Sequence, residues 1–262
     1  MLIRALLALA AALLAVAVFV VAGLPPRSAI RALALSPPGQ TAVMREREAQ
    51  ARARGRRPRR LQTWVPLAKV SRPLIQAVLA TEDQKFFGHE GVDWQALRES
   101  AETNVREGRS ARGGSTITQQ LAKNLFFTTE KSLVRKAREL IVARWLEEDL
   151  SKNRILTLYL NVIEWGDGLY GCEAAARAYF GKACGELSVE EAAGLAGIIP
   201  SPRRLNPQAS PARYERAKRR ALRLMTHAGY VERSVAGLGR EPEPEIEPDE
   251  ADPDGPDPTP GS

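Results

Sequence analysis

The feature that most constrains this chain is an apolar segment near its N-terminus, residues 5–24, which contains no charged side chain. About 20 such residues form a helix long enough to cross the hydrocarbon core of a bilayer. A cleaved signal peptide has a shorter apolar core and ends at a small-residue cleavage site, and no convincing site of that kind follows residue 24. The sequence therefore predicts that residues 1–26 form a single, uncleaved transmembrane anchor.

The charges beside this anchor do not decide which way the chain crosses the membrane. Arg4 and the amino terminus lie on one side of the apolar segment, and Arg27 and Arg31 lie on the other. The positive-inside rule weighs short flanks of this kind, and here the two flanks nearly balance. The arginine-rich residues 45–60 lie further away and argue only weakly for a cytoplasmic body, so the orientation has to follow from function.

The rest of the chain divides by composition into a linker, a domain and a tail. We expect residues 27–60 to form a basic juxtamembrane linker, with a helix near residues 41–55. Residues 61–235 show helical apolar spacing in several segments and no strong strand alternation, heptads or repeats. Residues 236–262 are rich in acids and prolines, which is typical of a disordered tail. The predicted fold class is mainly α, behind one transmembrane helix.

Capping signals place several helices within the predicted domain. Ser71, followed by Pro73, begins one helix, and Ser151 begins another. Ser188 and Glu191 have the spacing of a capping box at the start of a third helix. Residues 132–151 also repeat the apolar spacing of a helix, so these segments should supply much of the helical body.

The body of the protein is strongly basic once the tail is set aside. Residues 241–262 hold nine acidic and no basic residues, so leaving them out raises the formal net charge from +7 to +16. Five of the eight lysines fall within residues 123–182. A compact ammonium group suits phosphate, and a basic body favours nucleic acid, acidic lipid or a phosphate-bearing substrate. Chance clustering on a solvated face is the alternative reading of the lysines.

Several catalytic classes lack their motifs in this sequence. There is no Walker A, G-x-S-x-G, G-x-G-x-x-G or Ser-x-x-Lys pattern. Cys172 and Cys184 are too few for a four-ligand zinc site, even with the distant His89 and His227. The two cysteines fit either free core thiols or, outside the cytoplasm, a disulfide. Carboxylates remain as the candidates for catalysis.

Two acids stand out by their neighbours. Glu82 comes where an apolar helix ends, just before two phenylalanines, and aromatic walls would desolvate it and raise its pKa towards the range of a general base. Glu139 follows Arg135 and Lys136 at helical spacing, which places one acid within a cationic group. A solvated or capping acid and a row of surface ion pairs are the alternatives for these residues taken alone.

Residues 113–124, GGSTITQQLAKN, form a polar run with a single cation. Glycines let a backbone approach a ligand closely, and the hydroxyl and amide side chains can bond sugar or phosphate oxygens. Lys123 lies three and four residues after Gln120 and Gln119, so the three share one helix face. The run therefore predicts a ligand cradle, while simple packing of a loop onto a helix is the alternative.

Five segments resemble those of peptidoglycan glycosyltransferases and follow one another in the order expected of that family. Together they cover about residues 61–225, nearly all of the predicted domain. The chain shows no transpeptidase domain, so it resembles the monofunctional biosynthetic transglycosylases rather than the bifunctional penicillin-binding proteins. The segments are EDQKFFGHEGVD, GGSTITQQLAKN, RKARELIVARWLE, ILTLYLNVIEWGDGLYGCEAAARAYFGK and SVEEAAGLAGIIPSPRRLNP.

The resemblance implies a lysozyme-like fold and an enzyme that polymerises lipid II into β-1,4 glycan strands. Glu82 would be the general base for the 4-hydroxyl of the acceptor GlcNAc, which attacks the donor MurNAc with inversion and expels undecaprenyl diphosphate. Glu139 would be the second catalytic acid, with leaving-group assistance, metal binding and orientation of the cations left open. The residues implied in substrate binding are Asp83, Phe86, His89, Ser115, Thr116, Gln119, Gln120, Lys123, Asn124, Lys131, Arg135 and Lys136.

The resemblance also implies the surroundings of the reaction. Cations fixed at the leaving diphosphate would stabilise the transition state. A divalent ion, Mg²⁺ or Mn²⁺, is expected at the diphosphate, with no protein metal ligand assigned and no organic cofactor. Lipid II is polymerised on the outer face of the cytoplasmic (inner) membrane, so the body should be periplasmic or extracellular on a single-pass anchor. The expected partners are lipid II, the growing glycan chain, membrane lipid and other cell-wall synthases, without nucleic acid.

Two other readings remain open at this point. A membrane-anchored, lysozyme-like hydrolase could share the fold and one glutamate, but its acceptor is water and it needs no cationic diphosphate site. A basic membrane scaffold that binds nucleic acid would carry aromatic stacking platforms or a recognisable motif, and the sequence shows neither.

Overall fold

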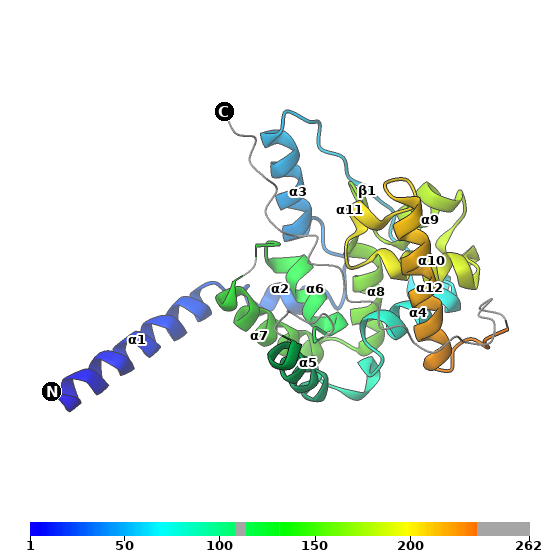
Figure 1. The fold of residues 1–262 in the computed structure, drawn as a ribbon. Helices are drawn as coiled ribbons and strands as arrows, with labels where there is room; N and C mark the ends of the chain where they lie inside the picture. The colour runs from blue at the N-terminus through cyan, green and yellow to red at the C-terminus, as the bar shows by residue number, and fades with distance from the viewer. Residues whose placement is uncertain (108–113, 131, 235–262) are drawn as a thin grey trace, which may run out of the picture.

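The computed structural model describes residues 1–107, 114–130 and 132–234, and these residues are mainly helical, which confirms the predicted fold class (Figure 1). The acidic tail predicted at residues 236–262 lies outside the described residues. The α-helices are α1 Leu2–Ala22, α2 Arg27–Ala32, α3 Ala42–Ala53, α4 Arg72–Glu82, α5 Trp94–Glu107, α6 Ile117–Phe126, α7 Leu133–Asp149, α8 Lys152–Val162, α9 Cys172–Phe180, α10 Val189–Ile198, α11 Pro202–Leu205 and α12 Pro211–His227. Short 3-10 turns are η1 Leu67–Lys69, η2 Phe86–Gly88 and η3 Cys184–Glu186.

The capping signals in the sequence act as predicted. The Ser71 hydroxyl accepts a hydrogen bond from the Leu74 amide at the start of α4. Ser151 caps α8, and Ser188 forms a reciprocal capping box with Glu191 at α10. Each such bond satisfies an amide that the first helical turn leaves unpaired, so these residues fix where the helices begin.

A small sheet, which the sequence does not predict, lies beside the helices. Its strands are β1 Leu61–Gln62, β2 Glu164–Gly166 and β3 Leu169–Tyr170, in the order β1-β3-β2. β1 pairs parallel to β3, with Leu61 opposite Leu169, and β2 pairs antiparallel to β3. Strands of two or three residues are too short to show an alternating apolar pattern, which is why the sequence does not reveal them.

Two groups of helices enclose the core. α4, α10 and α12 pack against one another, while α6 packs against α3, α7 and α8. The two groups meet where the end of α4 contacts α6, since Gln120 bonds the Glu82 side chain and the Ile117 amide bonds Asp83. Leu74 of α4, Leu121 of α6, Leu146 of α7 and Leu156 of α8 are fully or almost fully buried in one continuous core. This core holds the end of α4 in place against α6.

The N-terminal helix α1 stands away from the body (Figure 1). It is the one helix among the described residues that is long and apolar enough to cross a membrane, and it buries no residue within the protein. Its last turn meets α7, where the Arg138 guanidinium donates to the carbonyls of Phe19 and Val20. Arg138 therefore satisfies the Phe19 carbonyl at the end of α1 and adds a second bond to the Val20 carbonyl, which also accepts from the Gly23 amide.

Residues 27–60 contain two helices that pack on the body. Ile30 of α2 and Met44 of α3 are fully buried, and Thr41 caps α3 through a bond from the Met44 amide. The helix predicted near residues 41–55 is thus confirmed. The boundaries that divide the chain at residues 26, 60 and 235 stay predictions.

Candidate active site

The carboxylate of Glu82 lies at the last residue of α4 and is held by an amide from α6. Gln120 Nε2 donates to Glu82 Oε2 at 2.7 Å, and Tyr159 of α8 donates its hydroxyl to Gln120 Oε1 at 2.9 Å. Because the amide accepts on one side, its nitrogen faces the carboxylate. These two consecutive hydrogen bonds, from α8 to α6 and from α6 to α4, thus fix the position of the Glu82 oxygen.

Burial raises the pKa of Glu82, although the hydrogen bond from Gln120 and the charges of Lys123 and Arg220 act in the opposite direction. Desolvation disfavours the charged form of a carboxylate, so an ionised Glu82 is a stronger base than a solvated glutamate. The sequence predicts that the two phenylalanines after Glu82 raise its pKa. In the structure Phe86 is fully buried and packs on Phe87 and His89. We therefore attribute the raised pKa to burial of Glu82 by the protein as a whole.

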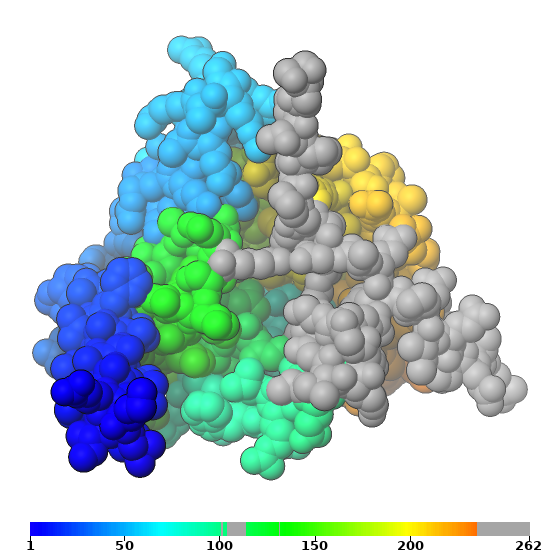
Figure 2. Space-filling view, turned by 60° about the vertical axis from the view of Figure 1, so that its left-hand side comes forward, coloured from blue at the N-terminus to red at the C-terminus, as the bar shows by residue number. Residues whose placement is uncertain are grey.

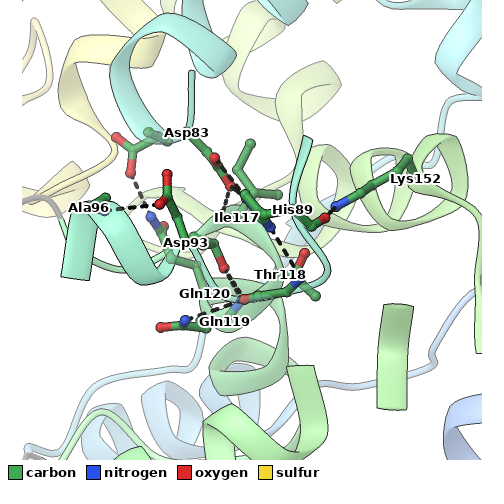
Figure 3. A network of polar contacts seen from close by, with 12 residues as sticks. Asp83, His89, Asp93, Ala96, Ile117, Thr118, Gln119, Gln120 and Lys152 are labelled. Carbon is green, nitrogen blue, oxygen red and sulfur yellow. Dashed lines mark hydrogen bonds and ion pairs between the residues drawn. The ribbon is translucent and has the colours of Figure 1, made fainter. Parts of the chain in front are cut away.

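Asp83 forms a buried clasp between the end of α4 and the start of α6 (Figure 3). Its Oδ2 accepts from the Ile117 amide at 3.0 Å, and both oxygens lie 3.0 Å from His89 Nε2. His89 Nδ1 accepts from the Gly91 amide, so the ring proton lies on Nε2 and is donated to Asp83. These bonds fix the side chain of Asp83, the residue that follows Glu82, and so hold the end of α4 against the start of α6.

The polar run joins α6 to α7 rather than standing free. The Thr116 hydroxyl caps α6 and donates to the Gly91 carbonyl at 2.7 Å. Lys136 Nζ of α7 donates to Ser115 Oγ and to Gln119 Oε1, both at 2.8 Å. Gln119 of the predicted cradle is therefore held by a cation of the next helix, and its role in ligand binding stays a prediction.

Glu139 is buried on α7 within a group of cations. It is paired with Arg135 one turn earlier and with Lys136, whose Nζ lies 3.6 Å from Glu139 Oε2. Desolvation lowers the pKa of Lys136, and the Glu139 carboxylate opposes that shift. The helical spacing in the sequence thus predicted this arrangement correctly.

Lys123 connects the two acids electrostatically. Desolvation lowers the pKa of Lys123, whereas the charges of Glu139 and Glu82 favour its protonated form. An ammonium group that both carboxylates act on lies within the same site as both of them. Contacts join the two acids through α6, since Gln120 bonds Glu82 while Gln119 accepts from Lys136, which lies 3.6 Å from Glu139. Glu82, Lys123, Lys136 and Glu139 are therefore treated as one cluster, in which the charge of Lys123 acts on both acids.

The predicted site residues fall into two groups in the structure. Glu82, Gln120, Lys123, Arg135 and Glu139 belong to the cluster, together with Ser115, Gln119 and Lys136. Five others have a polar group or ring engaged within the protein; they are Asp83, Phe86, His89, Thr116 and Asn124. Lys131 lies outside the described residues. The roles assigned to all these residues stay predictions.

The sequence did not indicate three residues that act on the cluster. Tyr159 orients Gln120, while the charges of Arg220 on α12 and Arg47 on α3 act on Glu82 and Lys123 respectively. A tyrosine within an apolar helix is a weak signal, because a buried hydroxyl needs a partner. No local pattern marks the arginines, which reach the cluster only through tertiary packing.

The described residues offer no protein cage for a metal ion. No group of three or more His, Cys, Asp or Glu side chains that could hold one occurs among them. Glu139, the acid nearest the cations, is already engaged by Arg135 and Lys136. A divalent ion at this site would need most of its ligands from a substrate and from water.

Comparisons with known proteins agree with the motifs. A family model described as Transglycosylase matches residues 48–226. The chain is 48% identical over 166 residues to a biosynthetic peptidoglycan transglycosylase of Dechloromonas aromatica, which covers 63% of this chain and 72% of that protein. A protein of the same description from Herminiimonas arsenicoxydans is 45% identical over 164 residues, covering 63% and 68% of the two chains.

A solved structure was also found. The crystal structure of penicillin-binding protein 1A from Haemophilus influenzae aligns with a TM-score of 0.40 and 24% sequence identity. The alignment covers 70% of this chain and 18% of that one.

Proposed function

The chain belongs to the transglycosylase family and is a peptidoglycan glycosyltransferase, and we propose that it polymerises lipid II into β-1,4 glycan strands with inversion, releasing undecaprenyl diphosphate. The observation that supports this reaction best is that α6 carries both Gln120, which holds the Glu82 carboxylate at 2.7 Å, and Lys123, whose charge acts on Glu82. A desolvated carboxylate is suited to accepting a proton, and a buried cation is suited to stabilising a departing anion.

In the proposed mechanism, ionised Glu82 accepts the proton of the 4-hydroxyl of the acceptor GlcNAc. The hydroxyl oxygen attacks the anomeric carbon of the donor MurNAc from the face opposite the diphosphate. The bond to the diphosphate breaks, and the proton stays on Glu82. The hydrogen bond from Gln120 holds the carboxylate in place, so less motion is needed as the bond forms.

Fixed cations stabilise the diphosphate as it departs. Its negative charge increases while the glycosidic bond breaks, so Lys123, Arg135 and Lys136 bind the transition state more tightly than the ground state. Ser115, Gln119 and Gln120 would bond sugar or phosphate oxygens beside them. Lys131, outside the described residues, is proposed for the same group from its place in the motif.

A divalent ion is proposed as part of the substrate rather than of the protein. Mg²⁺ or Mn²⁺ bound together with the diphosphate would neutralise charge on the leaving group. We expect EDTA to slow polymerisation and added Mg²⁺ to restore it, as measured by lipid II consumption. An unchanged rate in EDTA would show that the protein cations suffice.

The pKa of Glu82 predicts two pH effects. Activity should fall on the acid side of a pKa above the ordinary value of 4.5, because only the ionised form accepts a proton. The raised pKa also stabilises the fold below about pH 4.5, and that contribution is lost as pH rises through the folded-state value. The difference in free energy of unfolding between the Glu82→Gln variant and the natural protein should therefore shift in favour of the variant from pH 4.5 towards neutrality. Denaturant titrations of both proteins at several pH values would measure this difference. An advantage that stays constant with pH would contradict the shift.

We place the catalytic body on the outer face of the cytoplasmic membrane, where lipid II is polymerised. The anchor would keep the body at the membrane, on whichever side it lies, because Arg138 ties the end of α1 to the helix that carries Glu139. The cluster is thus attached to the membrane segment through a single helix. Lipid II, the growing strand and membrane lipid are the proposed partners, with other cell-wall synthases.

This placement predicts an oxidised cysteine pair. Cys172 and Cys184 are buried free thiols whose sulfur atoms lie 3.3 Å apart. Outside the cytoplasm, exchange with an oxidised dithiol donor would join them, with both thiol protons lost and the donor reduced. Closing so short a loop should stabilise the fold by about 3 kcal/mol. Alkylation after denaturation should find no free thiol in protein from the envelope and two in protein from the cytoplasm; two in both would contradict the expectation.

The proposed function is tested with purified full-length protein, labelled lipid II and Mg²⁺ in detergent. We expect long glycan strands on gels, which an enzyme specific for β-1,4 bonds then digests. Cleavage of finished peptidoglycan without strand formation would instead support the hydrolase. Neither activity from folded protein would contradict the proposal.

A further inference from the structure

A hollow lined by arginines lies beside the small sheet, away from Glu82. It is open to solvent, and its cavity volume is about 60 Å³. It lies between the C-terminal half of α3, the segment that follows α3, the turn between β2 and β3, and α11. In Figure 2 the light-blue residues of α3 and the following segment adjoin the yellow residues near α11. The arginines that line it are Arg47, Arg54, Arg56, Arg57, Arg59 and Arg203.

Only two of these six arginines have an acidic partner in the described part of the chain. Arg47 Nε lies 3.0 Å from Glu164 Oε2, and Arg203 Nε lies 3.3 Å from Asp167 Oδ1. Arg203 Nε is nevertheless buried and makes no hydrogen bond among the described residues. The other four guanidinium groups are left without a described counter-charge, and like charges in one hollow repel one another unless an anion neutralises them.

The backbone holds the wall of the hollow in place. The Leu61 amide donates to the Gly168 carbonyl at 2.8 Å, which fixes the segment after α3 against the β2–β3 turn. Gly168 has φ of 70°, and a Cβ there would come within 2.5 Å of the Arg59 carbonyl oxygen. Only glycine permits so close an approach, so the arginines converge on a preformed surface.

We propose that the acidic C-terminal segment of this chain, residues 241–257, docks in the arginine hollow. This segment contains nine acids and no basic residue, which complements the four uncompensated charges. Its prolines at 242, 244, 248, 253 and 256 restrict the chain, so less conformational entropy is lost on docking. A segment within the same chain also has a high effective concentration at the hollow, which a free anion lacks.

The connection is long enough to reach. The 17 residues of α12 span about 25 Å at about 1.5 Å per residue, and the start of α12 packs on α11 at the hollow. Six residues separate Ser234 from Glu241, and about 3.3 Å per extended residue spans roughly 20 Å. The acidic segment can therefore run back along α12 and enter the hollow.

The test is a binding measurement on the full-length chain in detergent, independent of catalysis. The probe is a fluorescently labelled synthetic peptide of residues 241–258, followed by anisotropy. One protein has the natural tail, and a second has Glu→Gln and Asp→Asn at all nine acidic positions of the tail. The neutral-tail chain should bind the peptide about tenfold or more tightly than the natural chain, since its hollow is vacant. Raising the salt concentration should weaken the binding.

Matched variants of the neutral-tail chain assign the binding to the hollow. Arg54→Gln, Arg56→Gln and Arg57→Gln together should abolish peptide binding. Arg213→Gln, Arg216→Gln and Arg223→Gln remove the same charge from exposed positions of α12 and should leave binding unchanged. Equal affinity of the natural and neutral-tail chains, or equal loss in both triple variants, would overturn the proposal. So would binding of vesicles rich in acidic phospholipid through these arginines without peptide binding, which would assign the hollow to the membrane.

Discussion

Replacing Glu82 by glutamine is expected to lower the rate of lipid II polymerisation by about 10²–10⁴-fold, the usual contribution of a general base. Glutamine keeps the size of the side chain and can still bond Gln120, but it cannot accept the proton of the acceptor hydroxyl. Burial raises the pKa of the natural carboxylate, so removing its charge should leave the fold at least as stable at neutral pH. Initial rates with labelled lipid II, together with thermal unfolding, measure both effects.

The matched control for this change is Glu90→Gln. Glu90 is an exposed acid of the same motif, 77% accessible and paired with Arg144 at the surface. Its substitution removes the same charge and should leave the rate within about twofold, since exposed ion pairs contribute little. A Glu82→Gln protein that polymerises at the natural rate would remove Glu82 from the role of base.

Replacing Lys123 by methionine should lower the rate by about 10²–10³-fold, the scale of one lost electrostatic contact to the transition state. Methionine fills a similar volume but carries no charge to stabilise the leaving diphosphate. Desolvation lowers the pKa of Lys123, which shows that the folded protein holds this charge at a cost. The variant should therefore unfold at the same or a higher temperature than the natural protein.

Lys152→Met supplies the contrast. Lys152 Nζ donates to the His89 carbonyl at 2.6 Å and pairs with Glu147 at 2.8 Å, over the ring of Phe86. Its loss leaves the His89 carbonyl without this donor and leaves the Glu147 carboxylate with the Thr118 hydroxyl but no cation, which should cost about 1–3 kcal/mol of stability, with a smaller effect on rate than Lys123→Met. If Lys123→Met instead lost stability and kept its rate, the cation would be structural.

Local patterns predicted the helices well because their signals lie within a few residues of one another. Ser71, Ser151 and the Ser188 box begin helices at the predicted places. The small sheet was missed because β1 and β3 are two residues long and pair across more than a hundred positions of the chain. No local pattern carries a contact of that kind.

The candidate site was predictable where spacing on one helix decides the geometry. Arg135, Lys136 and Glu139 on α7 follow that rule. The clasp of Asp83 with the Ile117 amide was not predictable, because it depends on how the end of α4 meets the start of α6. The same holds for Arg220, whose charge reaches Glu82 from a helix that begins more than a hundred residues later.

The central claim, that this site transfers a sugar from a lipid diphosphate to another sugar, is tested most directly by the stoichiometry of the products. Lipid II labelled in both the sugar and the lipid is incubated with the full-length protein, and both products are counted over time. We expect one undecaprenyl diphosphate to be released for each disaccharide added to a strand. Lipid release accompanied by free disaccharide, without strand growth, would show that water is the acceptor and would contradict it.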